Sequence, residues 1–175
     1  MERKILTILY TKKTIQERVS ALAEEIYHDY HPRELLLVGV LKGAFIFLAD
    51  LARALTLPVS VDFVRVSSYG SLTVSSGMVN ILKDVETPLT GKDVIIVEDI
   101  IDTGFTTAFL KNEFSKRKPR SLKICTLLDK RLRRRVDLDA DYVGITMDED
   151  HFVVGYGLDC AEKYRSLSDI YFIES

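Results

Sequence analysis

The sequence VIIVEDIIDTGFTT occupies residues 94–107, and it predicts more about the fold than any other stretch of the chain. Its first four residues form a short, uniformly apolar run, as expected for a strand that is covered on both faces. We expect a loop over residues 102–107 and a helix over residues 108–116. A strand, a loop and a helix in this order are the unit from which parallel sheets are built.

The same alternation extends to both sides of this stretch. We expect strands over residues 35–40, 59–69, 78–85 and 121–128, and helices over residues 14–30 and 44–55. The first helix begins at a candidate N-cap, Thr14, with Glu17 three residues later. Shorter strand-like runs follow at residues 142–147, 151–154 and 170–173. The sequence therefore predicts an α/β fold with a mainly parallel sheet.

Length and composition limit the class of protein. The 175 residues suit one domain of ordinary size. With 24 Lys and Arg against 26 Asp and Glu, the net charge of -2 gives no general reason to expect a nucleic-acid or membrane surface. Two cysteines are too few for a disulfide framework, and no apolar run is long enough to span a bilayer. We expect a cytoplasmic protein without a zinc site, since the three histidines lack metal-ligand spacing.

Polar residues cluster directly after the apolar run at 94–97, where ligands bind at the carboxyl ends of parallel strands. Adjacent carboxylates, Glu98 and Asp99, can accept hydrogen bonds from the vicinal hydroxyls of a sugar. The hydroxyls and glycine at 103–107 precede a predicted helix, whose first amides attract anions. Together they suggest a ribose 5-phosphate site. The alternative is that the acids merely end a strand and that Asp102 or Thr103 caps a helix.

The segment VEDIIDTGFTT resembles the phosphoribosyl pyrophosphate signature of type I phosphoribosyltransferases, and its EDIIDTG form resembles the hypoxanthine-guanine branch. Three further stretches match that branch in order: LKGAF at 41–45, SSYG at 67–70 and FVVGYGLDCAEKYRSL at 152–167. The similarity covers nearly the whole chain. It implies a single domain, with a core at about residues 14–140 and a small hood from about residues 1–13 and 141–175.

The resemblance also implies roles for individual residues. The pyrophosphate group would contact Leu41, Lys42, Gly43 and Arg165, and the peptide between Leu41 and Lys42 is often cis in the family. A loop that closes during the reaction would include Ser68 and Tyr69. The 5-phosphate would bind at Asp102, Thr103, Gly104, Phe105, Thr106 and Thr107. Asp159 would bind Mg²⁺, as would Glu98 and Asp99, which also match the ribose ligands.

Asp102 matches the proposed general base, an acid that faces N7 of the purine. Three residues match the purine contacts: Lys130 to the 6-oxygen, Phe152 as the stacking aromatic, and Val153 through its backbone. The arginines that follow Lys130 are interpreted as a solvated basic face. Phe105, in a variable part of the phosphate loop, and Cys160, where an aromatic is frequent, are modest departures from the family.

The implied activity is transfer of the 5-phosphoribosyl group from phosphoribosyl pyrophosphate to N9 of hypoxanthine or guanine, with Mg²⁺, in a dimer or tetramer. The sequence leaves the preference among hypoxanthine, guanine and xanthine open. One alternative is a regulatory RNA-binding protein of the same fold, for which only KRLRRR at 130–135 offers a basic face. Another is a receiver-type signalling domain, although its acid pair belongs near the N-terminus.

Overall fold

A six-stranded sheet forms the centre of the computed structural model, which describes residues 5–68 and 79–174. Its strand order is β4-β3-β2-β5-β6-β7, and only the β3–β4 pair is antiparallel. The strands are β2 (Leu35–Leu41), β3 (Val59–Ser68), β4 (Val79–Lys83), β5 (Asp93–Ile101), β6 (Ser121–Asp129) and β7 (Tyr142–Thr146). The predicted, mainly parallel sheet is confirmed.

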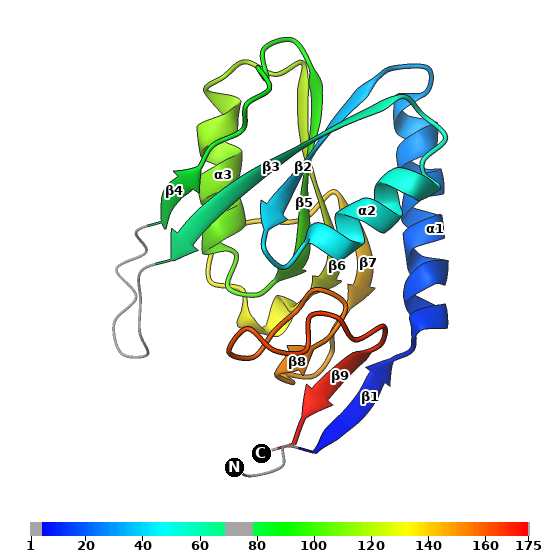
Figure 1. Cartoon of the computed structure of the whole chain (residues 1–175). Helices are drawn as coiled ribbons and strands as arrows, with labels where there is room; N and C mark the ends of the chain where they lie inside the picture. Colours follow the sequence, from blue (N-terminus) through cyan, green and yellow to red (C-terminus); the bar gives the residue numbers. More distant parts are fainter. Residues whose placement is uncertain (1–4, 69–78, 175) are drawn as a thin grey trace.

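Helices cover both faces of this sheet, α1 (Lys12–Tyr30) and α2 (Phe45–Ala54) on one and α3 (Phe105–Ser115) on the other (Figure 1). Successive strand residues point to opposite faces. Accordingly, Leu35 and Leu37 pack in the cluster under α1 and α2, whereas Leu36 and Val38 pack in the cluster under α3. This two-sided burial explains why the sequence of β2, LLLVGVL, is uniformly apolar. Within the described residues, no helix is long and apolar enough to cross a membrane.

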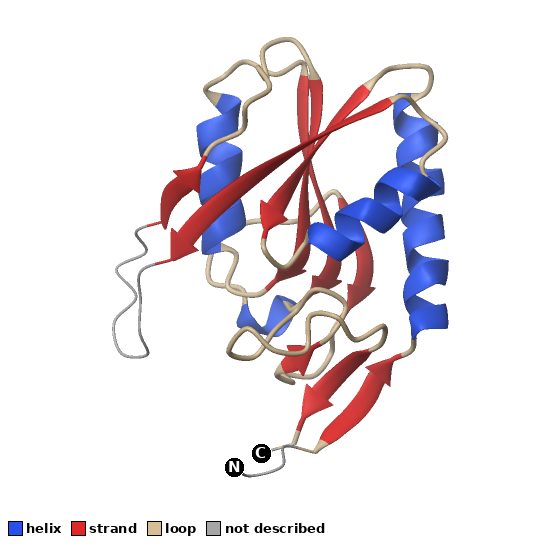
Figure 2. Cartoon of the chain, in the orientation of Figure 1, coloured by secondary structure: helices blue, strands red, loops and turns tan. Residues whose placement is uncertain are grey.

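A second, antiparallel sheet joins the two ends of the chain, in the order β1-β9-β8. It contains β1 (Leu6–Tyr10), β8 (Val153–Val154) and β9 (Ile170–Ile173). Figure 2 shows it beyond the carboxyl ends of the central strands, together with the loops of the last third of the chain. It corresponds to the predicted hood, and it faces the edge of the sheet where a ligand site was expected. The predicted hood boundary at residue 141 was wrong, because residues 142–146 form β7 and pair with β6 in the central sheet.

Among the predicted boundaries that were wrong, three lie at α1, β5 and α3. Helix α1 begins at Lys12, and its N-cap is Thr11 rather than Thr14, since the Thr11 hydroxyl accepts a hydrogen bond from the Thr14 amide at 3.2 Å. Strand β5 continues to Ile101, so Glu98 and Asp99 lie inside it. Helix α3 begins at Phe105, three residues before the predicted start. A left-handed glycine caps it, and apolar periodicity does not reveal such a cap.

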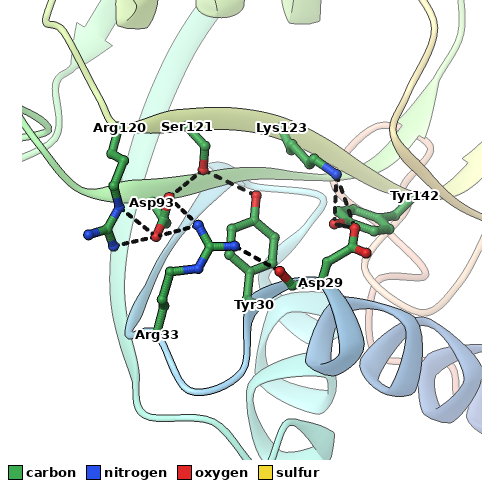
Figure 3. A network of polar contacts seen from close by, with 8 residues as sticks. All are labelled: Asp29, Tyr30, Arg33, Asp93, Arg120, Ser121, Lys123 and Tyr142. Atoms are coloured by element: carbon green, nitrogen blue, oxygen red, sulfur yellow. Dashed lines mark hydrogen bonds and ion pairs between the residues drawn. The ribbon is translucent and has the colours of Figure 1, made fainter.

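The amino ends of the central strands are tied to α1 by the polar network of Figure 3. Asp93, the first residue of β5, is fully buried. Its carboxylate accepts hydrogen bonds from Arg120 Nε at 2.9 Å, Ser121 Oγ at 2.6 Å and Arg33 Nη1 at 3.3 Å. A second group joins Asp29 to Lys123 and Tyr142. This network fixes the end of β5 opposite the predicted site.

Candidate active site

The side chains of Glu98 and Asp99, the two acids within β5, point to opposite faces of the sheet. Glu98 lies on the α3 side, where its Oε1 accepts a hydrogen bond from Thr107 Oγ1 at 3.2 Å, and it is 5% exposed. Asp99 lies against the loop between β2 and α2. A Cβ atom built on Gly43 would stand 1.8 Å from Asp99 Oδ2, so glycine is what allows this approach. The strand alternation therefore separates two residues that the sequence shows as a pair.

Burial makes both carboxylates reluctant to ionise. It raises the pKa of Glu98 well above its ordinary value, and the nearby Asp99 raises it further against the hydrogen bond from Thr107. Burial likewise raises the pKa of Asp99 to about 6, although backbone amides and the charge of Arg165 oppose it. Such shifts are common at functional sites, because binding rather than stability determines where the groups lie.

The turn from β5 into α3 has the geometry of an anion site. Gly104 has φ +87° and precedes the helix, and the Ala108 amide donates to its carbonyl at 2.9 Å. Phe105, Thr106 and Thr107 form the first turn of α3 rather than the predicted loop. Their amides belong to the group that finds no partner within a helix. The hydroxyl of Thr107 already donates to Glu98, so this hydroxyl proton is not available to an anion.

Asp102 lies at the start of this turn, beside the basic stretch. Its Oδ1 is shielded from solvent and accepts no hydrogen bond, although Arg133 Nε lies 3.3 Å away. Arg134 Nε donates to the Asp102 carbonyl at 3.3 Å, which fixes the backbone here. A solvent-shielded carboxylate oxygen without a donor is uncommon in a folded protein, and it is suited to receive a proton from a ligand.

Arg131, Arg133 and Arg135 of the basic stretch are exposed, as predicted for a solvated face, but several of its cations are also paired with carboxylates. Arg131 and Arg134 both bind Asp129, the fully buried last residue of β6. Lys130 is 5% exposed, and its ammonium donates to the His151 carbonyl at 2.8 Å and pairs with Asp150 at 2.7 Å. The short helix η1 (Arg131–Arg133) turns the chain so that these cations face carboxylates.

A cavity of about 280 Å³ connects the carboxyl ends of the strands to the hood. It is lined by Asp99, Ile100, Asp102, Lys130, Arg133, His151, Phe152, Val153, Leu158 and Asp159. Phe152 is 57% exposed, an unusual position for a large aromatic, whereas Val153 is buried. The structure thus places Lys130, Phe152 and Val153, the three predicted purine contacts, around one cavity. Glu98 is not among the lining residues.

The predicted pyrophosphate residues gather beside this cavity. The peptide between Leu41 and Lys42 is cis. Arg165 Nη1 donates to the Gly157 carbonyl at 2.7 Å, and Arg165 Nη2 lies 2.8 Å from Asp159 Oδ1. A Cβ atom on Gly157 would stand 2.1 Å from the Gly43 carbonyl oxygen, so the hood turn packs directly on the Lys42 loop. Of the predicted closing loop, Ser68 ends β3, and Tyr69 lies outside the described residues.

Several residues of the site were missed by sequence reasoning. Arg133 lines the cavity, and its Nη1 lies 3.7 Å from Asp150 Oδ1. His151, which we had interpreted as surface or structural, also lines the cavity. Glu162 pairs with Lys42. Their chain positions carry no pattern, because they become neighbours only when the hood meets the sheet. Gly157 and Leu158 lie in the GYGLD stretch that matches the family, but the match implied no role for either residue.

Among the residues that the structure describes, no group of three or more His, Cys, Asp or Glu side chains is placed to hold a metal ion. Mg²⁺ does not require one, since it binds through one or two carboxylates together with substrate phosphates and water. Asp159 is 28% exposed in its side chain and lies beside Arg165, at the boundary of the cavity and the pyrophosphate residues. The donor set therefore fits Mg²⁺ that arrives with a phosphorylated substrate.

Three features define a phosphoribosyltransferase. They are the parallel sheet with its hood, the turn into α3 that follows the acids of β5, and the cavity between the sheet and the hood. In agreement, the model of the phosphoribosyl transferase domain matches residues 6–161. The chain is 49% identical over 172 residues to the hypoxanthine-guanine phosphoribosyltransferase of Mycobacterium avium, which covers 95% of this chain and 84% of the relative. It is 47% identical over 167 residues to that of Bacillus subtilis, covering 95% and 92%. The chain belongs to the hypoxanthine-guanine phosphoribosyltransferase family.

Solved structures agree with this assignment. The crystal structure of a hypoxanthine-guanine phosphoribosyltransferase from Bacillus anthracis matches with a TM-score of 0.92 at 49% identity, covering 96% of this chain and 98% of that one. A hypoxanthine phosphoribosyltransferase from Staphylococcus aureus matches with a TM-score of 0.92 at 42% identity, covering 96% and 91%. The similarity extends over the central sheet and the hood alike.

Proposed function

We propose that this chain transfers the 5-phosphoribosyl group from phosphoribosyl pyrophosphate to N9 of hypoxanthine and guanine, forming the nucleotide and pyrophosphate in purine salvage. The observation that carries the proposal is the single cavity that joins the carboxylates of the sheet edge to Lys130, Phe152 and Val153 of the purine site. The relatives named above support the choice of substrates. We also expect a cytoplasmic homodimer or homotetramer, as the family resemblance implies.

The purine would bind between the hood and the end of β6. Phe152 offers an exposed ring on which a base can stack. Lys130 carries only donors, so its ammonium favours the 6-oxygen of hypoxanthine or guanine over the amino group of adenine. The backbone of Val153 would meet the base edge. Lys130 is held in place by the His151 carbonyl and Asp150, which positions its charge before the base arrives.

The sugar phosphate would bind at the turn that follows β5. The first amides of α3, with the loop residues 103–107, would hold the 5-phosphate at the positive end of the helix. Asp99, which lines the cavity, would accept hydrogen bonds from the ribose hydroxyls. Glu98 would support this end of the sheet from the α3 side through Thr107. Both acids ionise more readily once hydroxyl donors or Mg²⁺ approach them.

The leaving group would bind between the Lys42 loop and the hood. Leu41, Lys42 and Gly43 would contact pyrophosphate together with the planar guanidinium of Arg165. Arg165 Nε is buried without a hydrogen-bond partner, so it has a donor to offer. Asp159 would hold Mg²⁺, which supplies positive charge to the phosphate oxygens. Charge neutralisation of the leaving group then lowers the barrier as the bond to C1′ breaks.

Asp102 would act as the general base. The bond from C1′ to the pyrophosphate oxygen breaks, N9 forms the new bond to C1′ on the opposite face, and the proton on N7 passes to Asp102. Its Oδ1 accepts no other hydrogen bond. Positioning and charge, rather than a covalent intermediate, account for the rate in this proposal.

The RNA-binding alternative finds no support in the site. Its basic face was to come from KRLRRR, yet Arg131 and Arg134 bind Asp129, and Arg133 lies against Asp102 and Asp150. Paired cations leave little charge for a phosphate backbone.

The test is an assay of the full chain with phosphoribosyl pyrophosphate, Mg²⁺ and each purine in turn. We expect nucleotide and pyrophosphate from hypoxanthine and guanine, none from adenine, and none with any purine after chelation of Mg²⁺. Product formation with adenine alone, or without a divalent cation, would contradict the proposal.

A further inference from the structure

A carboxylate bridges the two cations that are proposed to hold pyrophosphate. Glu162 Oε2 lies 2.8 Å from Lys42 Nζ, and Glu162 Oε1 lies 3.4 Å from Arg165 Nη2. Its two oxygens thus occupy positions that two oxygens of a phosphate group could take between the same side chains. Lys42 reaches it from the loop after β2, 120 residues away in the chain.

The backbone aims Glu162 at this position. Cys160 and Lys163 are joined by two backbone hydrogen bonds of 3.2 and 3.1 Å, which close a two-residue turn. Both central residues have positive φ, 50° at Ala161 and 62° at Glu162. Such turns favour glycine and asparagine, and side chains with a Cβ atom adopt them reluctantly. The amide of Glu162 donates to Asp159 Oδ2 at 2.8 Å, which secures the turn.

The bridge must open when pyrophosphate binds. Lys42 and Arg165 cannot give the same hydrogen atoms to a carboxylate and to a phosphate, and two anions so close repel each other. The side chain of Glu162 is 63% exposed, so it can rotate into solvent without disturbing the core. No rearrangement of the sheet is needed for the exchange.

We propose that Glu162 is a positioning residue that competes with pyrophosphate for Lys42 and Arg165. It pairs with both cations between turnovers and pairs with them again when pyrophosphate dissociates. The inference rests on the proposed function, because it requires these two cations to bind pyrophosphate. Glu162 thereby limits the affinity for the leaving group and speeds its release. Nucleotide binding, which uses the helix turn and the purine site, does not depend on it.

The test measures magnesium pyrophosphate binding to the full chain by calorimetry at low ionic strength, with dissociation rates from stopped flow. Glu162→Gln should bind magnesium pyrophosphate about fivefold more tightly and release it more slowly, the scale of one or two exposed ion pairs. The affinity of Glu162→Gln for a nucleoside monophosphate should equal that of the wild type. Glu17→Gln is the matched control, because Glu17 is 65% exposed and pairs with Lys13 on α1.

A second variant separates bridging from net charge. Glu162→Asp keeps the charge but is one methylene shorter, so it should lose the two-sided contact and also bind pyrophosphate more tightly. Aspartate tolerates positive φ, so the turn is retained. The inference is overturned if Glu162→Gln binds pyrophosphate no more tightly than the wild type, or if Glu162→Asp behaves like the wild type. Wild-type protein that neither binds pyrophosphate nor forms nucleotide would instead refute the proposed function itself.

Discussion

Asp93→Asn should destabilise the protein without impairing the chemistry of the site. Asp93 is fully buried, and three donors converge on its carboxylate (Figure 3). Asparagine keeps the shape but loses the charge, and its amide group turns N–H donors toward the guanidinium groups of Arg33 and Arg120. Asp99, the proposed ribose ligand in β5, lies six residues after Asp93, which is about 20 Å at the rise of a strand.

The magnitude follows from the three contacts. Hydrogen bonds to a charged group contribute about 1.5–3 kcal/mol each, and removing one partner of a buried pair typically costs about 3–5 kcal/mol. The side chains of Arg33 and Arg120 are 42% and 52% exposed, so solvent screens both pairs. We therefore expect the lower end, about 3 kcal/mol. For a chain of this size, that loss lowers the melting temperature by about 6–12 °C.

The pH dependence has a definite sign. Burial alone raises the pKa of Asp93, but the hydrogen bonds from Arg120 and Ser121 and the charge of Arg33 outweigh it, so the pKa lies below its ordinary value. An acid with a lowered pKa stabilises the fold above its unfolded pKa, and this contribution is lost as the pH falls through the folded value. The difference between wild type and variant should therefore stay constant from pH 6 to 8 and shrink below about pH 4.

Urea denaturation followed by circular dichroism measures the free energy of unfolding for wild type, Asp93→Asn and the control Asp137→Asn, in which an exposed aspartate loses the same charge. Turnover per folded molecule should be unchanged in both variants. A loss below about 1 kcal/mol in Asp93→Asn, or an equal loss in the control, would refute the reasoning about the buried network.

Three further predictions concern the site. Asp102→Asn should lower turnover about 10²-fold or more, the scale of a lost general base, with nucleotide affinity nearly unchanged in titrations; near-normal turnover would remove the assignment. Lys130→Ala should raise the KM for hypoxanthine far more than the KM for phosphoribosyl pyrophosphate, and equal weakening of both would argue against a contact to the base alone. Asp99→Asn should raise the melting temperature at pH 7.5, because burial raises the pKa of Asp99 to about 6 and its ionisation above that pH opposes folding. This gain should shrink as the pH falls from about 6 to about 4 and vanish below that, where the wild-type carboxyl is protonated in both states. A gain that is the same at pH 7.5 and at pH 3 would contradict the cause given.

The sequence alone predicted the layers of the fold because its signals are local. Uniform apolar runs such as residues 94–97 require cover on both faces, and the strand–loop–helix order requires parallel pairing. Errors occurred where geometry rather than hydrophobicity sets the boundary. Gly104 allows α3 to begin at Phe105, and Thr11 caps α1 with a hydroxyl that has no apolar signature.

The candidate site divides in the same way. The resemblance located residues from Leu41 to Arg165 along the chain, and the structure brings Asp102, Lys130 and Phe152 to one cavity. Only the tertiary structure separated Glu98 from Asp99, because the pleat of β5 sends neighbours to opposite faces.

Sequence by itself thus determined the elements and the motif that carries the phosphate turn. The tertiary structure decided which charges meet: Arg133 with Asp102, Asp150 with Lys130, and Glu162 with Lys42. These pairs join the hood or the stretch after β6 to other parts of the chain. Their distances depend on how the chain ends pack onto the sheet, and no local pattern of residues encodes that packing.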